Sequence, residues 1–161
     1  MDRFPGKYVG IVVDNDDPKG LSRIRAQVPE ILIEETTGWC LPSAVFAGPG
    51  VGLAVVPPIG GLVFVEWPAG DVTRQAIWSG GLWADGDGVD GAGPDAFVLV
   101  TPGGHRVELR DTSGDEAIEV SAASGAVLVL DSKGVTVSFG GQKLEMTNSG
   151  ISINDGALEV I

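Results

Sequence analysis

Short runs of alternating apolar and polar residues, separated by glycine-containing turns, fill the last 60 residues of the chain. The alternation has a period of two, which is typical of β-strands with one buried and one solvated face. No window repeats apolar residues at spacings of three and four over three turns, so the pattern predicts no helix that could cover such a sheet. The last glycines of successive turns are Gly104, Gly114, Gly125, Gly134, Gly141, Gly150 and Gly156.

The apolar members of these runs define one predicted face, while the other face carries charged and hydroxyl side chains. An uncovered apolar face must find a partner surface. Two arrangements remain open from the pattern: the strip folds back on itself as a sandwich, or identical strips from several chains share an axis, with their edges paired between chains. The predicted apolar face comprises Val107, Leu109, Ile118, Val120, Val135, Val137, Phe139, Leu144, Met146, Ile151, Ile153, Leu158 and Val160.

The first half of the chain has a different character, with strand-like segments broken by Pro and Gly. Strands are expected at residues 7–14, 21–28, 38–45, 52–56, 61–67 and 75–79. Six short strands in about eighty residues are typical of a small β-barrel. The stretch WADGDGVDGAGPDA holds almost nothing that could be buried. We therefore expect a barrel at residues 1–84, a linker at 85–95 and the strip at 96–161.

Charge and cysteine usage exclude several classes of protein. Residues 1–95 carry 6 basic and 13 acidic residues, a net charge of −7, and the whole chain carries −12. This disfavours binding to phosphates or anionic lipids, which depends on clustered Lys and Arg. Cys40 is the only cysteine, so the sequence predicts no intrachain disulfide and no thiolate zinc site. The start MDRFPGKYVG lacks the features of a signal sequence, and we expect a soluble chain made in the cytoplasm.

Three stretches together resemble the spike proteins of contractile injection machines, namely phage baseplate assembly protein V and the spike region of VgrG proteins. YVGIVVDNDDPKGLSRIRAQVPEI is similar to the opening barrel hairpin of that family. The segment from GWCLP to SGGLW resembles its tryptophan strand, its Pro-x-x-Gly turn and its closing Gly-Gly-Leu-Trp. TPGGHRVELRDTSGDEAIEVSAASGA resembles the opening of the spike's β-helix.

The resemblance implies an all-β chain: an N-terminal OB-fold barrel followed by a C-terminal trimeric, intertwined β-helix or β-prism. It favours the shared axis over the sandwich. The implied protein is a non-enzymatic, homotrimeric, membrane-puncturing spike in the baseplate of a phage tail or related particle. Its implied partners are hub, tube and baseplate proteins, a PAAR-like tip protein and the target cell envelope, with no nucleic acid and no cofactor.

Candidate chemical motifs favour structural roles. His105 is the only histidine and lies at the start of a strand, where a turn role is expected rather than catalysis or metal binding. The stretch DNDDPKG lacks the ligand spacing of an EF-hand calcium loop and predicts a turn. Some short phage spikes carry a His-x-His pair that binds iron at the tip. ISINDGALEVI has none, so no metal site is predicted, and Asn154 and Asp155 are expected in a turn.

A rival function is open for an OB-fold chain: binding of nucleic acid or of carbohydrate by a two-domain β-protein. Single-stranded nucleic acid requires a basic groove with stacking aromatic residues. The barrel has the aromatic residues, but residues 1–95, which contain it, carry a net charge of −7. The strip has only Phe97 and Phe139 on which a sugar could stack.

Overall fold

A computed structural model describes residues 3–161 of the chain. Strands make up 44% of it, and its only helical element within the described residues is the short 3-10 turn η1 at Pro68–Gly70. No helix in residues 3–161 has the length and hydropathy needed to cross a membrane. The chain divides into two compact units, one ending at Asp87 and the other spanning Gly88–Ile161.

The first unit is built on a five-stranded sheet with the strand order β2-β1-β6-β7-β3. All neighbours in this sheet are antiparallel except β3 and β7, which run parallel. The strands are β1 (Tyr8–Asp14), β2 (Arg25–Gln27), β3 (Leu41–Pro42), β6 (Leu62–Glu66) and β7 (Ile77–Leu82).

Isolated bridges close this sheet into a barrel. Ile24, just before β2, pairs with Cys40, just before β3, and Gln27 pairs with Thr36. The two edge strands are thereby joined, and closure removes the free edges of β2 and β3 on which other chains could pair. The predicted barrel strand at residues 21–28 is shorter than expected, because residues 21–23 lie outside the ladder and Ile24 joins it only through an isolated bridge.

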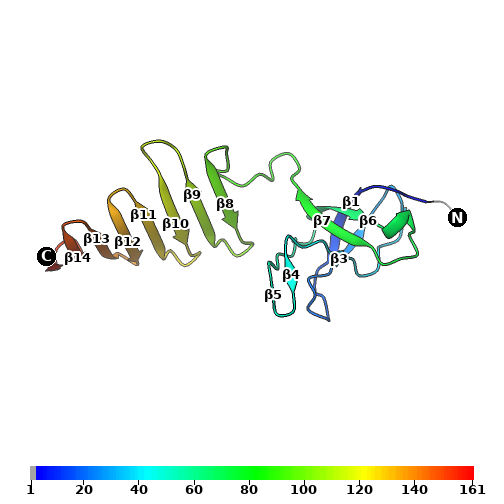
Figure 1. Cartoon of the computed structure of the whole chain (residues 1–161), viewed down its shortest axis with the longest axis horizontal. Helices are drawn as coiled ribbons and strands as arrows, with labels where there is room; N and C mark the ends of the chain where they lie inside the picture. Colours follow the sequence, from blue (N-terminus) through cyan, green and yellow to red (C-terminus); the bar gives the residue numbers. More distant parts are fainter. Residues whose placement is uncertain (1–2) are drawn as a thin grey trace. The chain divides into compact units, whose positions relative to one another are not determined.

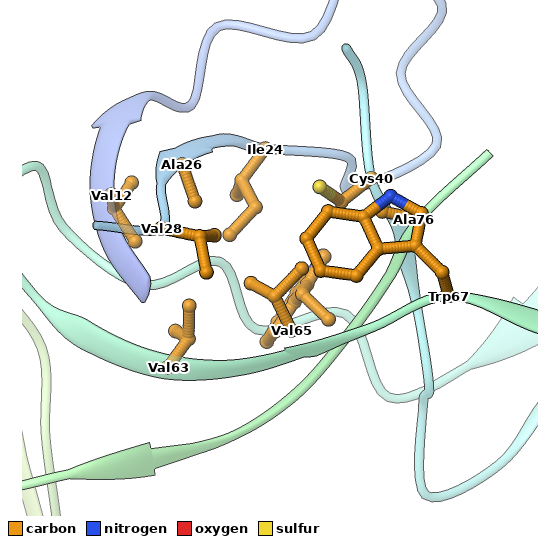
Figure 2. Packing of buried hydrophobic residues seen from close by; sticks show 10 residues of the cluster. Val12, Ile24, Ala26, Val28, Cys40, Val63, Val65, Trp67 and Ala76 are labelled. Atoms are coloured by element: carbon orange, nitrogen blue, oxygen red, sulfur yellow. The ribbon is translucent and has the colours of Figure 1, made fainter. Parts of the chain in front are cut away.

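The interior of the barrel is a single cluster of buried apolar side chains (Figure 2). Val12, Val63 and Val65 come from the central strands, and Ile24 and Cys40 come from the closing bridge. The burial of Cys40 raises the pKa of its thiol. The cluster comprises Val12, Ile24, Ala26, Val28, Cys40, Val63, Val65, Trp67, Ala76 and Trp78.

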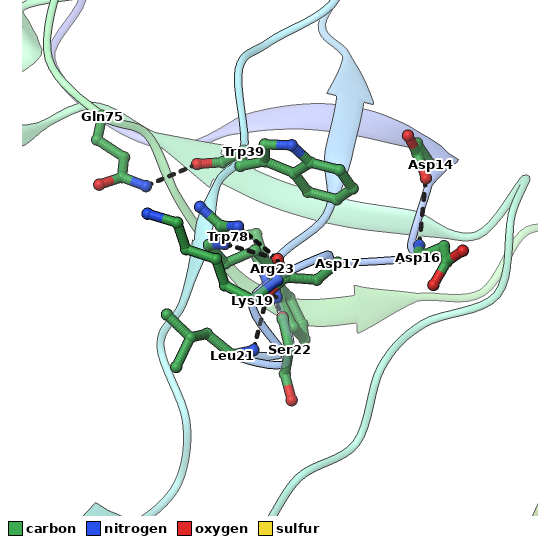
Figure 3. A network of polar contacts seen from close by, with 10 residues as sticks. All are labelled: Asp14, Asp16, Asp17, Lys19, Leu21, Ser22, Arg23, Trp39, Gln75 and Trp78. Carbon is green, nitrogen blue, oxygen red and sulfur yellow. Dashed lines mark hydrogen bonds and ion pairs between the residues drawn. The ribbon is translucent and has the colours of Figure 1, made fainter.

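An ion pair between Asp17 and Arg23 closes the connection between β1 and β2 (Figure 3). The Nε of buried Arg23 donates to Oδ1 of Asp17 at 3.0 Å, and the Asp17 carboxylate also accepts from the backbone N–H groups of Lys19 and Leu21. The guanidinium carbon of Arg23 lies 5.4 Å from the centre of the Trp39 ring. The hydrogen bond from Arg23 holds the pKa of Asp17 well below its usual range. The motif DNDDPKG is therefore a turn, as expected, and Asp17 serves as its anchor.

One segment of the first unit differs from its sequence expectation. The predicted strand at residues 52–56 is replaced by a small separate hairpin of β4 (Ala47–Gly48) and β5 (Val51–Gly52). Residues 53–56 have no regular structure. The Leu53 N–H donates to the carbonyl of Phe46 at 3.1 Å, but none of these residues joins the barrel sheet, which is complete without them.

The second unit is one antiparallel sheet in which every strand pairs with its neighbours in sequence, from β8 to β15. Figure 1 shows these strands side by side in chain order. Both edges of β9 to β14 are occupied by strands of the same chain. The strands are β8 (Ala96–Val100), β9 (Arg106–Arg110), β10 (Ala117–Ser121), β11 (Val127–Asp131), β12 (Gly134–Phe139), β13 (Gln142–Thr147), β14 (Gly150–Ile153) and β15 (Leu158–Val160).

The sheet of the second unit narrows toward its C-terminal end. The strands have six residues in β13, four in β14 and three in β15. Seven gaps between eight strands, at about 4.8 Å each, give the sheet an extent of about 34 Å across its strands. The unit is thus a long, tapering strip one layer thick.

Candidate trimerisation surface

The strand register of the second unit aligns its apolar residues in two continuous rows that cross all eight strands. Each row places one apolar side chain per strand directly opposite the next, on the same face of the sheet. The first row is Phe97, Leu109, Ile118, Leu130, Val135, Met146, Ile151 and Val160. The second row is Leu99, Val107, Val120, Leu128, Val137, Leu144, Ile153 and Leu158. We call this surface the apolar face.

The apolar face is uncovered in the single chain. None of its sixteen side chains is buried, and the exposed fraction reaches 65% at Phe97. Within residues 96–161 only Glu108 and Ala117 are buried, and both lie on the opposite face. A one-layer sheet with an open apolar face lacks the second layer that a stable domain needs. The strip therefore requires a covering surface.

The structure brings together the residues that the alternation predicted. Twelve of the thirteen lie in the two rows. Phe139 lies on the same face beyond the second row, since it is two residues from Val137 in β12 and opposite Gln142 of β13. Their burial between chains stays a prediction.

The alternation of the sequence did not identify four residues of the apolar face. Leu128 and Leu130 lie in the run VLVL, where every residue is apolar and alternation cannot choose a face. The register with β10 and β12 assigns them to the rows and places Val127 and Val129 on the other side. Phe97 and Leu99 were missed for the same reason, because AFVLV is also continuously apolar.

The opposite face carries a network of charges. Glu108 and Glu119 lie directly opposite each other in β9 and β10, an unfavourable pair of like charges. Arg106 donates to Glu108 from Nε at 2.8 Å, and Arg110 lies between the two carboxylates, with Nη1 at 3.3 Å from Glu108 and 3.7 Å from Glu119. The hydrogen bond from Arg106 lowers the pKa of Glu108. This charged surface is suited to water.

The turn between β14 and β15 is held by side chains. Asn154 and Asp155 both have positive φ, at 51° and 54°. Oδ1 of Asn154 accepts from the backbone N–H of Lys143 at 2.8 Å, and Asp155 lies 2.5 Å from the Lys143 ammonium, which raises the pKa of that lysine. Both residues thus act in a turn, as predicted.

His105, the residue considered for catalysis or metal binding, has a structural role in a turn. His105 is exposed in the turn before β9, and its Nδ1 accepts from the backbone N–H of Ala123 at 3.4 Å. In the part of the chain that the structure describes, no three His, Cys, Asp or Glu side chains are grouped to hold a metal ion.

Two family models match the chain, one for each unit. Residues 8–83 match the type VI secretion system/phage-baseplate injector OB domain. Residues 96–159 match the phage baseplate V C-terminal trimerisation domain. A search of curated proteins returned no match.

The matches and the structure agree on the architecture. The predicted fold class is confirmed: the chain is all-β, with an N-terminal OB domain and a C-terminal trimerisation domain of antiparallel strands. The intertwining of chains stays a prediction. The OB barrel and the trimerisation domain with its open apolar face each match a baseplate V model, and the chain belongs to the phage baseplate V/VgrG-type proteins.

Proposed function

We propose that the chain forms the homotrimeric central spike of a contractile phage tail or related injection machine. Three copies of the strip pack their apolar faces around a common axis, and the charged faces point outward. The protein acts mechanically, without catalysis or cofactor. The contracting sheath supplies the force that drives the spike through the target envelope.

The observation that carries this proposal is the pair of unbroken apolar rows from β8 to β15. A rod held by such rows buries apolar side chains at every level along its length, instead of in one central core. Strands β9 to β14 have both edges paired within the chain. Copies therefore contact one another through the faces of these strands and not through their edges. Any exchange of strands between copies is confined to other parts of the chain.

The OB barrel and the narrow end of the strip contact the remaining proposed partners. The OB barrel, residues 1–84, docks under the hub or tube and contacts baseplate proteins, and residues 85–95 link it to the spike at residues 96–161. β15 is the outermost described strand at the narrow end, and a PAAR-like tip protein is the expected partner there. The protein is a component of the virion or injection particle.

A trimer carries 3 × −12 = −36 charges. Such a particle is repelled by anionic membranes, so penetration has to be driven and does not start by adhesion. The same charge opposes the rival function of nucleic-acid binding.

The test is the mass of the purified full chain by multi-angle light scattering. The expected mass is about three times 16.5 kDa. It should persist on dilution, because the interface extends along the whole strip. A species of 16.5 kDa would contradict the proposal, since the apolar face would then be covered within one chain.

A further inference from the structure

The OB unit carries a groove of about 600 Å³ between the hairpin β4–β5 and the barrel strands β3 and β7. Figure 1 shows β4 and β5 set apart from β1, β6 and β7. All of the described residues that line this groove are uncharged. Its volume lies within the range of pockets that bind ligands. We call this surface the hairpin groove.

One side of the hairpin groove is an unpaired strand edge. β3 pairs with β7 only at Ile77 and Trp78, and the N–H of Ser43 then donates to the carbonyl of Trp78 at 2.8 Å. Beyond that bond β7 continues to Leu82 along β6. Residues 79–82 therefore pair with β6 on one edge and, among the described residues, with no strand on the other. Such an edge is a template for a further strand.

Two glycines leave this edge accessible. Gly80 and Gly81 are both exposed, and both line the hairpin groove. Gly80 has a φ of 60° next to the bulge between β6 and β7, so its backbone requires a glycine. Gly81 has no positive φ, and a Cβ atom added there would come no closer than 3.8 Å to another atom. Glycine inside a strand is typical of places where another backbone approaches closely.

The other side of the hairpin groove is apolar. Val45 is 88% exposed and Phe46 is 57% exposed, and Leu53 is exposed as well. No charged residue occurs between Glu35 and Glu66. A charged occupant would therefore lose its water without gaining an ion pair. The chemistry of this side favours uncharged, apolar side chains.

We propose that the hairpin groove binds an extended, uncharged segment of another protein, which adds to β7 as a further strand. Backbone hydrogen bonds to residues 79–82 hold the segment, and its alternate side chains pack on residues 45–55. Four strand residues span about 14 Å. The inference rests on the proposed docking of the OB barrel to baseplate proteins, and it names the surface and the chemistry of that contact.

The described segments of this chain are poor candidates for the added strand. Residues of the segment 45–55 form the wall of the groove themselves. Strands β9 to β14 have both edges paired within the sheet of the second unit. A copy of the chain could pair only through β8 or β15, the two outer strands of that sheet. Pairing of that kind would protect residues 79–82 in the trimer before any other protein is added.

The test is a selection of random decapeptides by mRNA display on the full-length trimer, with counter-selection on Phe46→Asp. The new carboxylate lies at the groove, so this variant should bind the recovered peptides at least tenfold more weakly. Ile33→Asp, a control at another exposed apolar position of the same unit, should bind them as the wild type does. The peptides should be uncharged, with apolar residues at alternate positions. Failure to recover peptides that distinguish the two variants would overturn the inference.

Hydrogen exchange measured by mass spectrometry locates the bound peptide. A saturating amount of the recovered peptide should slow exchange of residues 79–82 at least tenfold. Exchange of β1 should stay unchanged, because β1 already has strands on both edges. Protection that appears elsewhere and not at residues 79–82 would overturn the inference. Slow exchange of residues 79–82 without peptide would also overturn it, since a copy of the chain would then occupy the edge.

Methylation of single peptide amides separates strand addition from insertion of side chains alone. Alternate residues of a strand direct their N–H groups toward the neighbouring strand, so affinity should fall at least tenfold at every second position. Equal loss at all positions, or at none, would contradict strand addition. A wild-type mass of 16.5 kDa would instead overturn the proposed spike itself, so the two failures are distinguishable.

Discussion

Gly134, the first residue of β12, faces the backbone carbonyl of Met146 in β13. A Cβ atom on Gly134 would lie 2.0 Å from that carbonyl oxygen, and the φ angle of the glycine is 143°. No side chain fits there without separating the two strands. Gly150 repeats the relationship in β14, where a Cβ atom would lie 2.4 Å from the carbonyl oxygen of Val160. These glycines allow the strip to turn tightly enough to keep its rows in register.

Gly134→Ala should destabilise the trimer by about 3 kcal/mol or more, because a steric clash with backbone adds to the cost of positive φ. The measurement is urea unfolding at a fixed protomer concentration. Gly125→Ala is the matched control, since Gly125 also has positive φ but a Cβ atom added there would have no neighbour within 4 Å. Its cost should be about 1–2 kcal/mol. Equal effects of the two variants would contradict the close approach of β12 and β13.

Val137→Asp should convert the trimer into monomers. Three copies would place three carboxylates near one axis in an apolar environment, which costs several kcal/mol for each buried charge. The adjacent variant Ser138→Asp is the control, because Ser138 lies on the charged face opposite Lys143. Light scattering should give about 16.5 kDa for the first variant and three times that mass for the second. A trimer that tolerates Val137→Asp would rule out the axial position of this face.

Leu128→Lys and Val129→Lys test the part of the apolar face that alternation could not assign. Leu128 lies in the second row between Val120 and Val137, whereas Val129 lies opposite Glu119 on the charged face. We expect Leu128→Lys to abolish the trimer and Val129→Lys to leave the mass unchanged, since the new ammonium would lie beside a carboxylate. The reverse result would mean that the register of β11 is shifted by one residue.

The Asp17–Arg23 pair predicts an acid-sensitive barrel. The folded-state pKa of Asp17 is lowered by its hydrogen bond with Arg23, so the pair stabilises the fold above the unfolded pKa of about 3.9 and this contribution falls as pH decreases toward the folded value. In Asp17→Asn this pH-dependent loss should disappear below about pH 4, with lower stability at pH 7. Asp16→Asn is the control, because Asp16 makes no bond to Arg23 in the described structure.

Tryptophan fluorescence can follow this change in the barrel alone, because all four tryptophans lie in the first unit. An acid slope that is the same in wild type and Asp17→Asn would show that the ion pair does not contribute to stability.

The sequence by itself determined the class of fold and most of the apolar face. Val135, Val137 and Ile153 could be assigned because polar residues separate them from their apolar neighbours, and a period of two then leaves one choice of face. The glycine turns indicated where the strands end. Three motifs resembling a known family supplied the expectation of a shared axis, which alternation had left open.

Tertiary structure decided the rest. Leu128 and Val129 are both β-forming apolar residues, and only the pairing of β11 with β10 and β12 separates them, because register is a property of two strands together. The closure of the barrel through Ile24 and Cys40 depends on contacts far apart in sequence. The segment 52–56 is as apolar as a barrel strand, yet it lies outside the ladder, because the barrel sheet is complete without it.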